Sequence, residues 1–333
     1  MSKKSKTEKA RYINPFTDFG FKRIFGTEAN KDLLIDFLNA VLDIDGEIID
    51  LRYDNPERQG RVEIDRRAIF DLYCITGKGE HIIVEMQNVR QDYFRDRALY
   101  YASFPIQDQG EKGRNWDFQL TPVYSVNMLN FTFEEKSETE KQYLYHVQLI
   151  DKISNRVFID KLLFVFLELP NFTKAEHELK TDFEGWMYVL KHLAGLQELP
   201  YALRNRIFEK LFHVAEIAKM SPKEKKSYNQ SLKEYRDMYL MENALKKKEA
   251  LLQEKENVIQ GMHGEIQVMH VLIQGKDAVI QGKDAVIQEK DIALKKKDET
   301  MIRVLLETGL SVEKIAESTG LSMTEINRIK DSL

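Results

Sequence analysis

Two carboxylates, Asp71 and Glu85, lie in apolar runs on either side of a short turn in the segment IFDLYCITGKGEHIIVEMQ. Both runs are rich in β-branched and aromatic residues, which is typical of two strands joined as a hairpin. An isolated charge in an apolar strand is unfavourable unless a partner compensates it. The two acids are therefore the first candidates for a site with chemistry.

The turn TGKGE predicts that these acids face each other. If the hairpin is symmetric about Lys78, paired residues sum to twice that position, and Asp71 lies opposite Glu85. Opposed residues share a face of the sheet with Cβ atoms roughly 4.5–5.5 Å apart, and Gln87 shares that face. Like charges so placed repel, whereas a divalent cation such as Mg²⁺ binds carboxylate oxygens. The spacing predicts a one- or two-metal site at Asp71 and Glu85.

Alternatives to a metal site stay open. The hairpin could be asymmetric or its face solvated, and Arg66, Arg67 or Arg90 could pair with the acids. The pattern Asp-x(13)-Glu-x-Gln is weak by itself. It gains weight from its strand–turn–strand setting and from the basic, aromatic segment that follows.

The elements that position these residues follow from the hydrophobic pattern. Strands are predicted within residues 46–55, 61–76, 80–89, 120–131, 143–151 and 161–172. Two helices are predicted near the N-terminus, with a break between Gly26 and Asn30, and another from about Arg90 to about Gln107. From Asp182 onward the pattern is helical. The fold class is therefore α/β with a mixed central sheet, followed by an all-α region.

Several blocks in order carry a family resemblance: DFGFKRIFG, LLIDFLNAVL, FDLYCITGKGEHIIVEMQ, RDRALYYAS and TPVYSVNMLNF. Together they resemble the PD-(D/E)XK nuclease family transposases, also called recombination-promoting (Rpn) nucleases, from about Tyr12 to about residue 245. The resemblance implies a restriction-endonuclease-like core and DNA cleavage with Mg²⁺, for which Mn²⁺ can substitute. It implies that Asp71 and Glu85 are the motif acids and that Gln87 stands in the place of the motif lysine.

The chain departs from the family pattern at two positions. Phe70 stands where the motif has proline, which affects strand packing more than chemistry. Gln87 cannot act as a cation beside the attacking water, although its amide can orient that water. Lys22, Arg95 and Arg97 are candidates for the missing positive charge.

Further candidates are weaker. Lys22, Arg97 and Tyr101 are predicted to contact DNA, but Tyr100 and Tyr101 could equally belong to the core. Asp18 and Glu63 are possible additional acids. For Asp18 and Lys22, the better interpretation is an amphipathic helix that packs Phe19 or Phe21 into the core.

Charge and composition limit the cellular setting. The formal net charge of −4 gives no overall attraction to nucleic acid, so DNA contacts must come from local patches. The single cysteine, Cys74, fits a reducing compartment. The basic N-terminal residues lack the apolar segment of a signal peptide, and no apolar run is long enough to span a bilayer. We expect a soluble cytoplasmic protein without a membrane partner, and neither a zinc site nor a phosphate-binding glycine loop.

Beyond about residue 240, apolar residues recur at a spacing of seven. The nine positions are Leu245, Leu252, Ile259, Ile266, Ile273, Ile280, Ile287, Leu294 and Met301. This repeat predicts a helix that supercoils with a second copy, which makes a homo-oligomer. Lysines three positions after most of these residues, together with glycines, weaken the seam, so a solvated helical spacer is the alternative.

The last segment resembles a small helix-turn-helix unit, with Ser311 and Ser322 as helix N-caps and a turn at Gly320. Its mixed charge suits a helical cap as well as a DNA reader. The predicted organisation is a disordered basic tail (1–11), a nuclease-like core (12–180), a helical region (181–240), a heptad-repeat stalk (241–300) and this unit (301–333).

The leading functional hypothesis is a metal-dependent DNA endonuclease linked to recombination or mobile DNA, as the resemblance implies. The alternative is a catalytically weak or inactive protein with the nuclease fold, which acts as an oligomeric interaction or DNA-binding module. The missing motif lysine keeps that alternative open.

Overall fold

The computed structural model describes residues 10–58, 68–110, 117–133 and 142–332. The predicted acid Glu63, the arginines at 66 and 67 and most of the basic tail lie outside these residues. The chain divides into two compact units, Met1–Leu245 and Lys246–Leu333. In the part of the chain that the structure describes, no helix has the apolar length needed to span a membrane.

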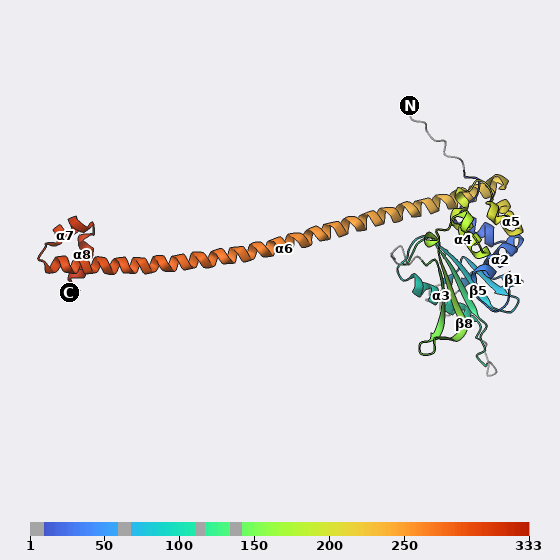
Figure 1. Cartoon of the computed structure of the whole chain (residues 1–333), viewed down its shortest axis with the longest axis horizontal. Helices are drawn as coiled ribbons and strands as arrows, with labels where there is room; N and C mark the ends of the chain where they lie inside the picture. Colours follow the sequence, from blue (N-terminus) through green and yellow to red (C-terminus); the bar gives the residue numbers. More distant parts are fainter. Residues whose placement is uncertain (1–9, 59–67, 111–116, 134–141, 333) are drawn as a thin grey trace, which may run out of the picture. The chain divides into compact units, whose positions relative to one another are not determined.

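A six-stranded mixed sheet forms the centre of the first unit (Figure 1). Its strand order is β1-β4-β5-β6-β8-β7. Its strands are β1 (Leu51–Tyr53), β4 (Leu72–Thr76), β5 (His81–Gln87), β6 (Val123–Leu129), β7 (Leu144–Asp151) and β8 (Arg156–Glu168). Strands β5, β6 and β8 are parallel, and the other pairings are antiparallel. A separate antiparallel pair joins β2 (Glu57–Arg58) to β3 (Ala68–Ile69). The predicted mixed sheet is confirmed.

Helices cover both faces of this sheet. One face packs against α1 (Asp18–Phe25), α2 (Lys31–Val41), α4 (Asp182–His192) and α5 (Arg206–Ala215), and the other packs against α3 (Phe94–Asp108). Side chains alternate between the faces, so Val84 belongs to the first core and Ile83 to the second. Short 3-10 turns lie between the longer elements, at Glu28–Asn30, Leu169–Asn171, Glu176–Glu178, Leu193–Gly195, Tyr201–Leu203 and Ile217–Lys219.

The start of α3 differs from the prediction. The helix begins at Phe94 rather than near Arg90, because Tyr93 adopts a left-handed backbone conformation with φ of 60°. A left-handed residue cannot continue a right-handed helix, so the preceding segment forms a loop. This loop leads from the end of β5 to the helix, so it determines which α3 side chains reach the carboxylates.

Helix α1 is amphipathic, as its pattern predicts. Thr17 caps it by accepting a hydrogen bond from the Gly20 backbone N–H, and Phe21 is buried. A Cβ atom at Gly20 would lie 2.1 Å from the backbone oxygen of Asn14. Glycine at this position therefore allows the preceding loop to close against the first turn of the helix.

Helix α6 (Pro222–Glu307) starts in the first unit and continues into the second. Its first turns are hydrogen-bonded to α1 and to the segment before it. Tyr228 accepts a hydrogen bond from the backbone N–H of Asn14, and Ser231 accepts one from that of Phe19. The helix continues through the boundary predicted near residue 240, because the sequence there contains no proline or glycine.

The nine apolar residues at a spacing of seven are all exposed on α6, from 43% for Met301 to 62% for Ile266. Such exposure agrees with a stripe that a second chain could cover, but supercoiling stays a prediction. At the end of the chain, α7 (Val312–Thr319) and α8 (Met323–Lys330) pack on α6 through Ile302, Ile315 and Ile326. Gly320 ends α7 with φ of 75°, and a capping box of Ser322 and Glu325 starts α8.

Candidate active site

The β4–β5 hairpin has the register that places the two acids together. Ile75 pairs with His81 and Leu72 with Val84, so paired residues sum to twice the position of Lys78. Asp71 lies one residue before β4, and the same register places it opposite Glu85 on β5. The predicted symmetric hairpin is confirmed.

Asp71 and Glu85 are in contact through the backbone. The backbone N–H of Asp71 donates to Glu85 Oε1 at 3.4 Å, and Asp71 Oδ2 accepts from the backbone N–H of Met86 at 2.8 Å. Each carboxylate thus has one oxygen bonded to the other strand. This arrangement orients both side chains without neutralising them.

Burial makes the pair electrostatically unfavourable when both acids are ionised. Glu85 is 6% exposed. Loss of hydration, followed by the Asp71 charge, raises the pKa of Glu85 from 4.5 to about 8, although Arg97 opposes the change. Burial also raises the pKa of Asp71, the charge of Asp18 adds to this, and Met86, Lys22 and Arg97 lower it. The site therefore favours a positive charge between the two carboxylates.

Arg97 on α3 is the cation that contacts both motif positions. Its guanidinium lies 3.5 Å from Glu85 Oε2 and donates to Gln87 Oε1 at 3.1 Å. It also bonds to the Gln91 side chain, and its guanidinium carbon lies 5.2 Å from the ring centre of Tyr101. The Gln87 amide nitrogen donates to Val89 O at 3.1 Å. Among the three candidates for the missing charge, Arg97 is the one that the structure brings to Gln87.

The other predicted site residues make contacts of their own around Asp71 and Glu85. Asp18 and Lys22 form an exposed ion pair at 2.7 Å on α1, and both act electrostatically on Asp71. Arg95 lies over the Phe133 ring at 4.4 Å, so it contacts another part of the core. Tyr101 is half-buried and packs edge-on against Phe70, with ring centres 5.5 Å apart. The aromatic residue in the motif proline position therefore supports the helix that carries Arg97.

One neighbour of Glu85 was not a candidate from the sequence. Asn127 on β6 pairs in register with Glu85 and is 1% exposed. Its amide nitrogen donates to Ser125 and to Val165 O. Among the described residues, no donor reaches its Oδ1. An asparagine in the apolar run VYSVNML was the available signal, because a buried amide requires hydrogen-bonding partners.

Comparison with known families decides what kind of protein carries this hairpin. The family model for PD-(D/E)XK nuclease family transposases matches residues 15–269. The chain belongs to this family. Comparisons with curated proteins and with solved structures found no match. The matched region includes the hairpin, α3 and the first part of α6, and it ends before α7 and α8.

PD-(D/E)XK nucleases generally use divalent metal ions, and the donor set of this nuclease-family site can be tested against that chemistry. Asp71 and Glu85 supply the hard carboxylate oxygens that Mg²⁺ prefers, and Mg²⁺ commonly takes one or two carboxylates, with water and substrate phosphate completing its shell. Within residues 10–58, 68–110, 117–133 and 142–332, no group of three or more His, Cys, Asp or Glu side chains could hold a metal. Two carboxylates alone would leave most of the coordination shell of such an ion to water and substrate.

Proposed function

We propose that this chain is a Mg²⁺-dependent DNA endonuclease linked to recombination or mobile DNA, acting in the cytoplasm, with Mn²⁺ able to replace Mg²⁺. The observation that supports this most is the contact of a buried acid, Glu85, with a half-buried one, Asp71, across a hairpin of a PD-(D/E)XK family core. A buried pair of like charges is destabilising in a purely structural role. Its presence supports a role in binding a cation.

Asp71 and Glu85 would hold the ion with their carboxylate oxygens. The ion, when bound, would polarise the scissile phosphate and lower the pKa of a water molecule. The backbone N–H groups of Asp71 and Met86 orient the carboxylates, because each donates to one carboxylate oxygen. The ligands are thus positioned before substrate arrives.

Arg97 would provide the charge that lysine provides in the family motif. Its guanidinium already contacts Gln87 and Glu85, and a guanidinium stays protonated at any working pH. It can donate to a non-bridging phosphate oxygen while the Gln87 amide orients the attacking water. Lys22 and Tyr101 would contact the DNA backbone beside this centre, with Asp18 as a further acid near Asp71.

The exposed stripe on α6 would join copies of the chain. A single helix cannot bury such a stripe, whereas a second copy can cover it and bring two cores together. Two active sites suit the cutting of both DNA strands. The lysines and glycines beside the stripe make the association weaker than in an ideal coiled coil.

The test is cleavage of supercoiled plasmid with Mg²⁺ or in chelator. Wild type should nick or cut with metal only, and Asp71→Asn and Glu85→Gln should each abolish cleavage. Asp160→Asn, at an exposed acid of β8 that lies 3.6 Å from Lys161, serves as the matched control and should cut normally. Cleavage that survives both site substitutions would disprove the assignment.

A second measurement separates loss of metal from loss of chemistry. Titration calorimetry should detect Mn²⁺ binding to wild type and weaker binding to Glu85→Gln. Metal binding without any DNA cleavage by wild type would favour the alternative, an inactive nuclease fold used for interaction. Gln87 in the place of the motif lysine is the observation that favours this alternative.

A further inference from the structure

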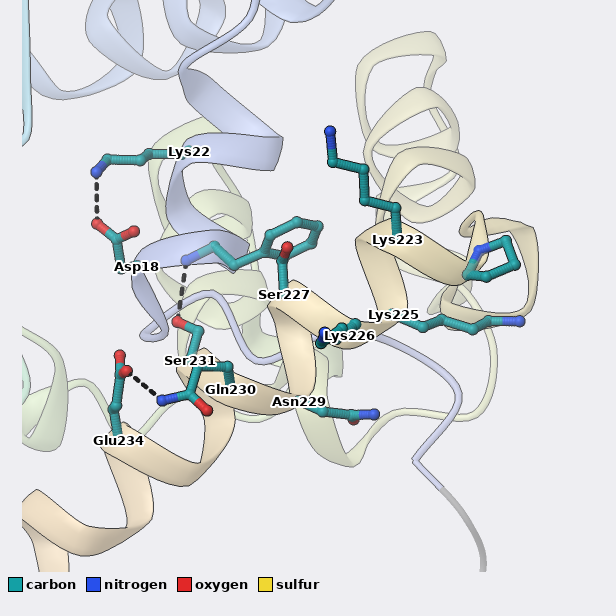
Figure 2. Close-up of a pocket in the computed structure, with 12 residues that line it drawn as sticks. Asp18, Lys22, Lys223, Lys225, Lys226, Ser227, Asn229, Gln230, Ser231 and Glu234 are labelled. Atoms are coloured by element: carbon teal, nitrogen blue, oxygen red, sulfur yellow. Dashed lines mark hydrogen bonds and ion pairs between the residues drawn. The ribbon is translucent and has the colours of Figure 1, made fainter.

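A groove between α1 and the first turns of α6 is lined by lysines (Figure 2). Its volume is about 1080 Å³, with Asp18, Phe19 and Lys22 on one side and residues Pro222 to Glu234 on the other. The α6 side contributes Lys223, Lys225 and Lys226. These residues are separated from α1 by some two hundred positions in the chain, so the groove is a product of tertiary structure.

Contacts between the two helices hold the groove in shape. Glu224 forms an ion pair with Arg23 at 2.5 Å, and Ser231 accepts a hydrogen bond from the Phe19 backbone at 3.1 Å. Tyr228 is buried between the same helices and accepts from the Asn14 backbone. Both walls therefore belong to one packed unit, and the groove does not require a partner to form.

The groove carries excess positive charge. Its lining has four lysines and two acids, and both acids are engaged: Asp18 with Lys22 at 2.7 Å and Glu234 with Gln230 at 2.7 Å. In the part of the chain that the structure describes, Lys223, Lys225 and Lys226 form no ion pair. Lys223 and Lys226 are exposed, whereas Lys225 is half-buried and extends away from Asp18 in Figure 2.

The segment before α1 contacts the end of the strand that carries Glu85, because the Asn88 side chain donates to Phe16 O at 2.8 Å. Asp18 and Lys22 line the groove, and the charges of both act on Asp71. A substrate strand whose phosphate reaches Asp71 and Glu85 would place its neighbouring phosphates over this surface. Lys223 and Lys226 lie about one turn apart on α6, and residues three apart on a helix have Cβ atoms roughly 5–6 Å apart. Their long, flexible side chains can therefore reach phosphates of one strand.

We propose that this groove binds the DNA backbone beside the scissile phosphate, with Lys223 and Lys226 as the phosphate-binding residues. The inference rests on the proposed nuclease function and adds a substrate surface to it. Ser227, Asn229 and Gln230 line the same wall and supply neutral donors. None of these contacts reads a base, so the surface gives affinity and register without sequence preference.

Salt dependence of DNA binding tests the proposal. The full-length Asp71→Asn protein would be titrated onto a fluorescein-labelled duplex, and anisotropy measured from 50 to 200 mM KCl. Each lysine that neutralises a phosphate contributes about 0.9 to the slope of log K against log salt. Lys223→Gln/Lys226→Gln in this background should reduce the slope by about 2 and weaken binding at 100 mM KCl by roughly tenfold or more.

The matched control is Lys152→Gln/Lys180→Gln, which removes two exposed lysines of the same unit outside the groove. It should leave the slope unchanged. Equal losses in both double variants, or no loss in the groove variant, would overturn the proposal. Each of these two results would overturn the groove proposal but not the proposed nuclease function, provided that wild type cuts plasmid with Mg²⁺. If wild type binds no DNA, the groove proposal and the nuclease function both fail. DNA binding without cleavage contradicts only the nuclease function.

Discussion

The stability of the metal-free protein should fall as pH rises, because Glu85 is buried beside Asp71. Burial, with the Asp71 charge added, raises the pKa of Glu85 from 4.5 to about 8. In the unfolded chain the carboxyl ionises near its ordinary value. Between these two values, the folded protein keeps a proton that the unfolded chain has released.

The sign and size follow from proton linkage. The proton on Glu85 stabilises the folded state fully below the unfolded pKa, and this contribution is lost as pH rises toward 8. One pKa unit corresponds to about 1.4 kcal/mol, so the loss approaches roughly 5 kcal/mol. Because Asp71 titrates together with Glu85, we expect a measured loss of about 3 to 5 kcal/mol between pH 5 and pH 9.

Urea unfolding of the full-length protein in chelator, from pH 5 to pH 9, measures this loss. Trp186 is fully buried in the core of the first unit, so its fluorescence follows the unfolding of that unit. Glu85→Gln keeps a neutral side chain at every pH and should remove most of the slope. Parallel pH profiles for wild type and Glu85→Gln would refute the reasoning.

A matched control comes from an acid with the opposite shift. Hydrogen bonds from Ser221, followed by Arg23, lower the pKa of Glu224 to about 2. This carboxylate is ionised in both the folded and the unfolded state above pH 5. Glu224→Gln should therefore change the stability by a similar amount at each pH and leave the slope as in wild type.

Three further predictions concern the metal, the stalk and α1. Mg²⁺ at pH 8 should raise the melting temperature of wild type more than that of Glu85→Gln, because the ion binds Asp71 and Glu85 in the folded state. An equal rise in both proteins would mean that the ion binds elsewhere. Sedimentation velocity at tens of micromolar should show an oligomer, and Asp substitutions at Ile266, Ile273 and Ile280 should dissociate it. The same substitutions on the opposite side of the helix, at Val271, Ala278 and Ala285, should not, and a monomeric wild type would leave α6 as a spacer. Gly20→Ala would place Cβ 2.1 Å from Asn14 O and should destabilise the first unit by about 1–3 kcal/mol in urea unfolding. Gly195→Ala, where nothing lies within 4 Å of the new Cβ, should change it far less, and similar losses would contradict the steric argument.

The sequence by itself determined most strands of the central sheet and the hairpin that carries the acids. It missed β2, and the strand predicted to end at residue 172 ends at Glu168. The alternation of apolar residues around TGKGE predicts two strands, and the turn length predicts that Asp71 faces Glu85, which the register confirms. Such features depend on interactions between residues close in the chain, and periodicity records them directly. The start of α3 was misplaced by about four residues, because the left-handed backbone at Tyr93 has no composition signal.

The tertiary structure alone decided which side chains surround the acids. Lys22, Arg95 and Arg97 are equivalent candidates in the sequence, and the packing of α3 on the sheet brings Arg97 to Gln87 while Arg95 contacts Phe133. Asn127 becomes a neighbour of Glu85 only through the parallel pairing of β5 with β6. The lysine groove depends on a contact between Phe19 and Ser231 across 212 positions. Such contacts follow from how whole elements pack in space, and neighbouring residues in the chain carry no record of them.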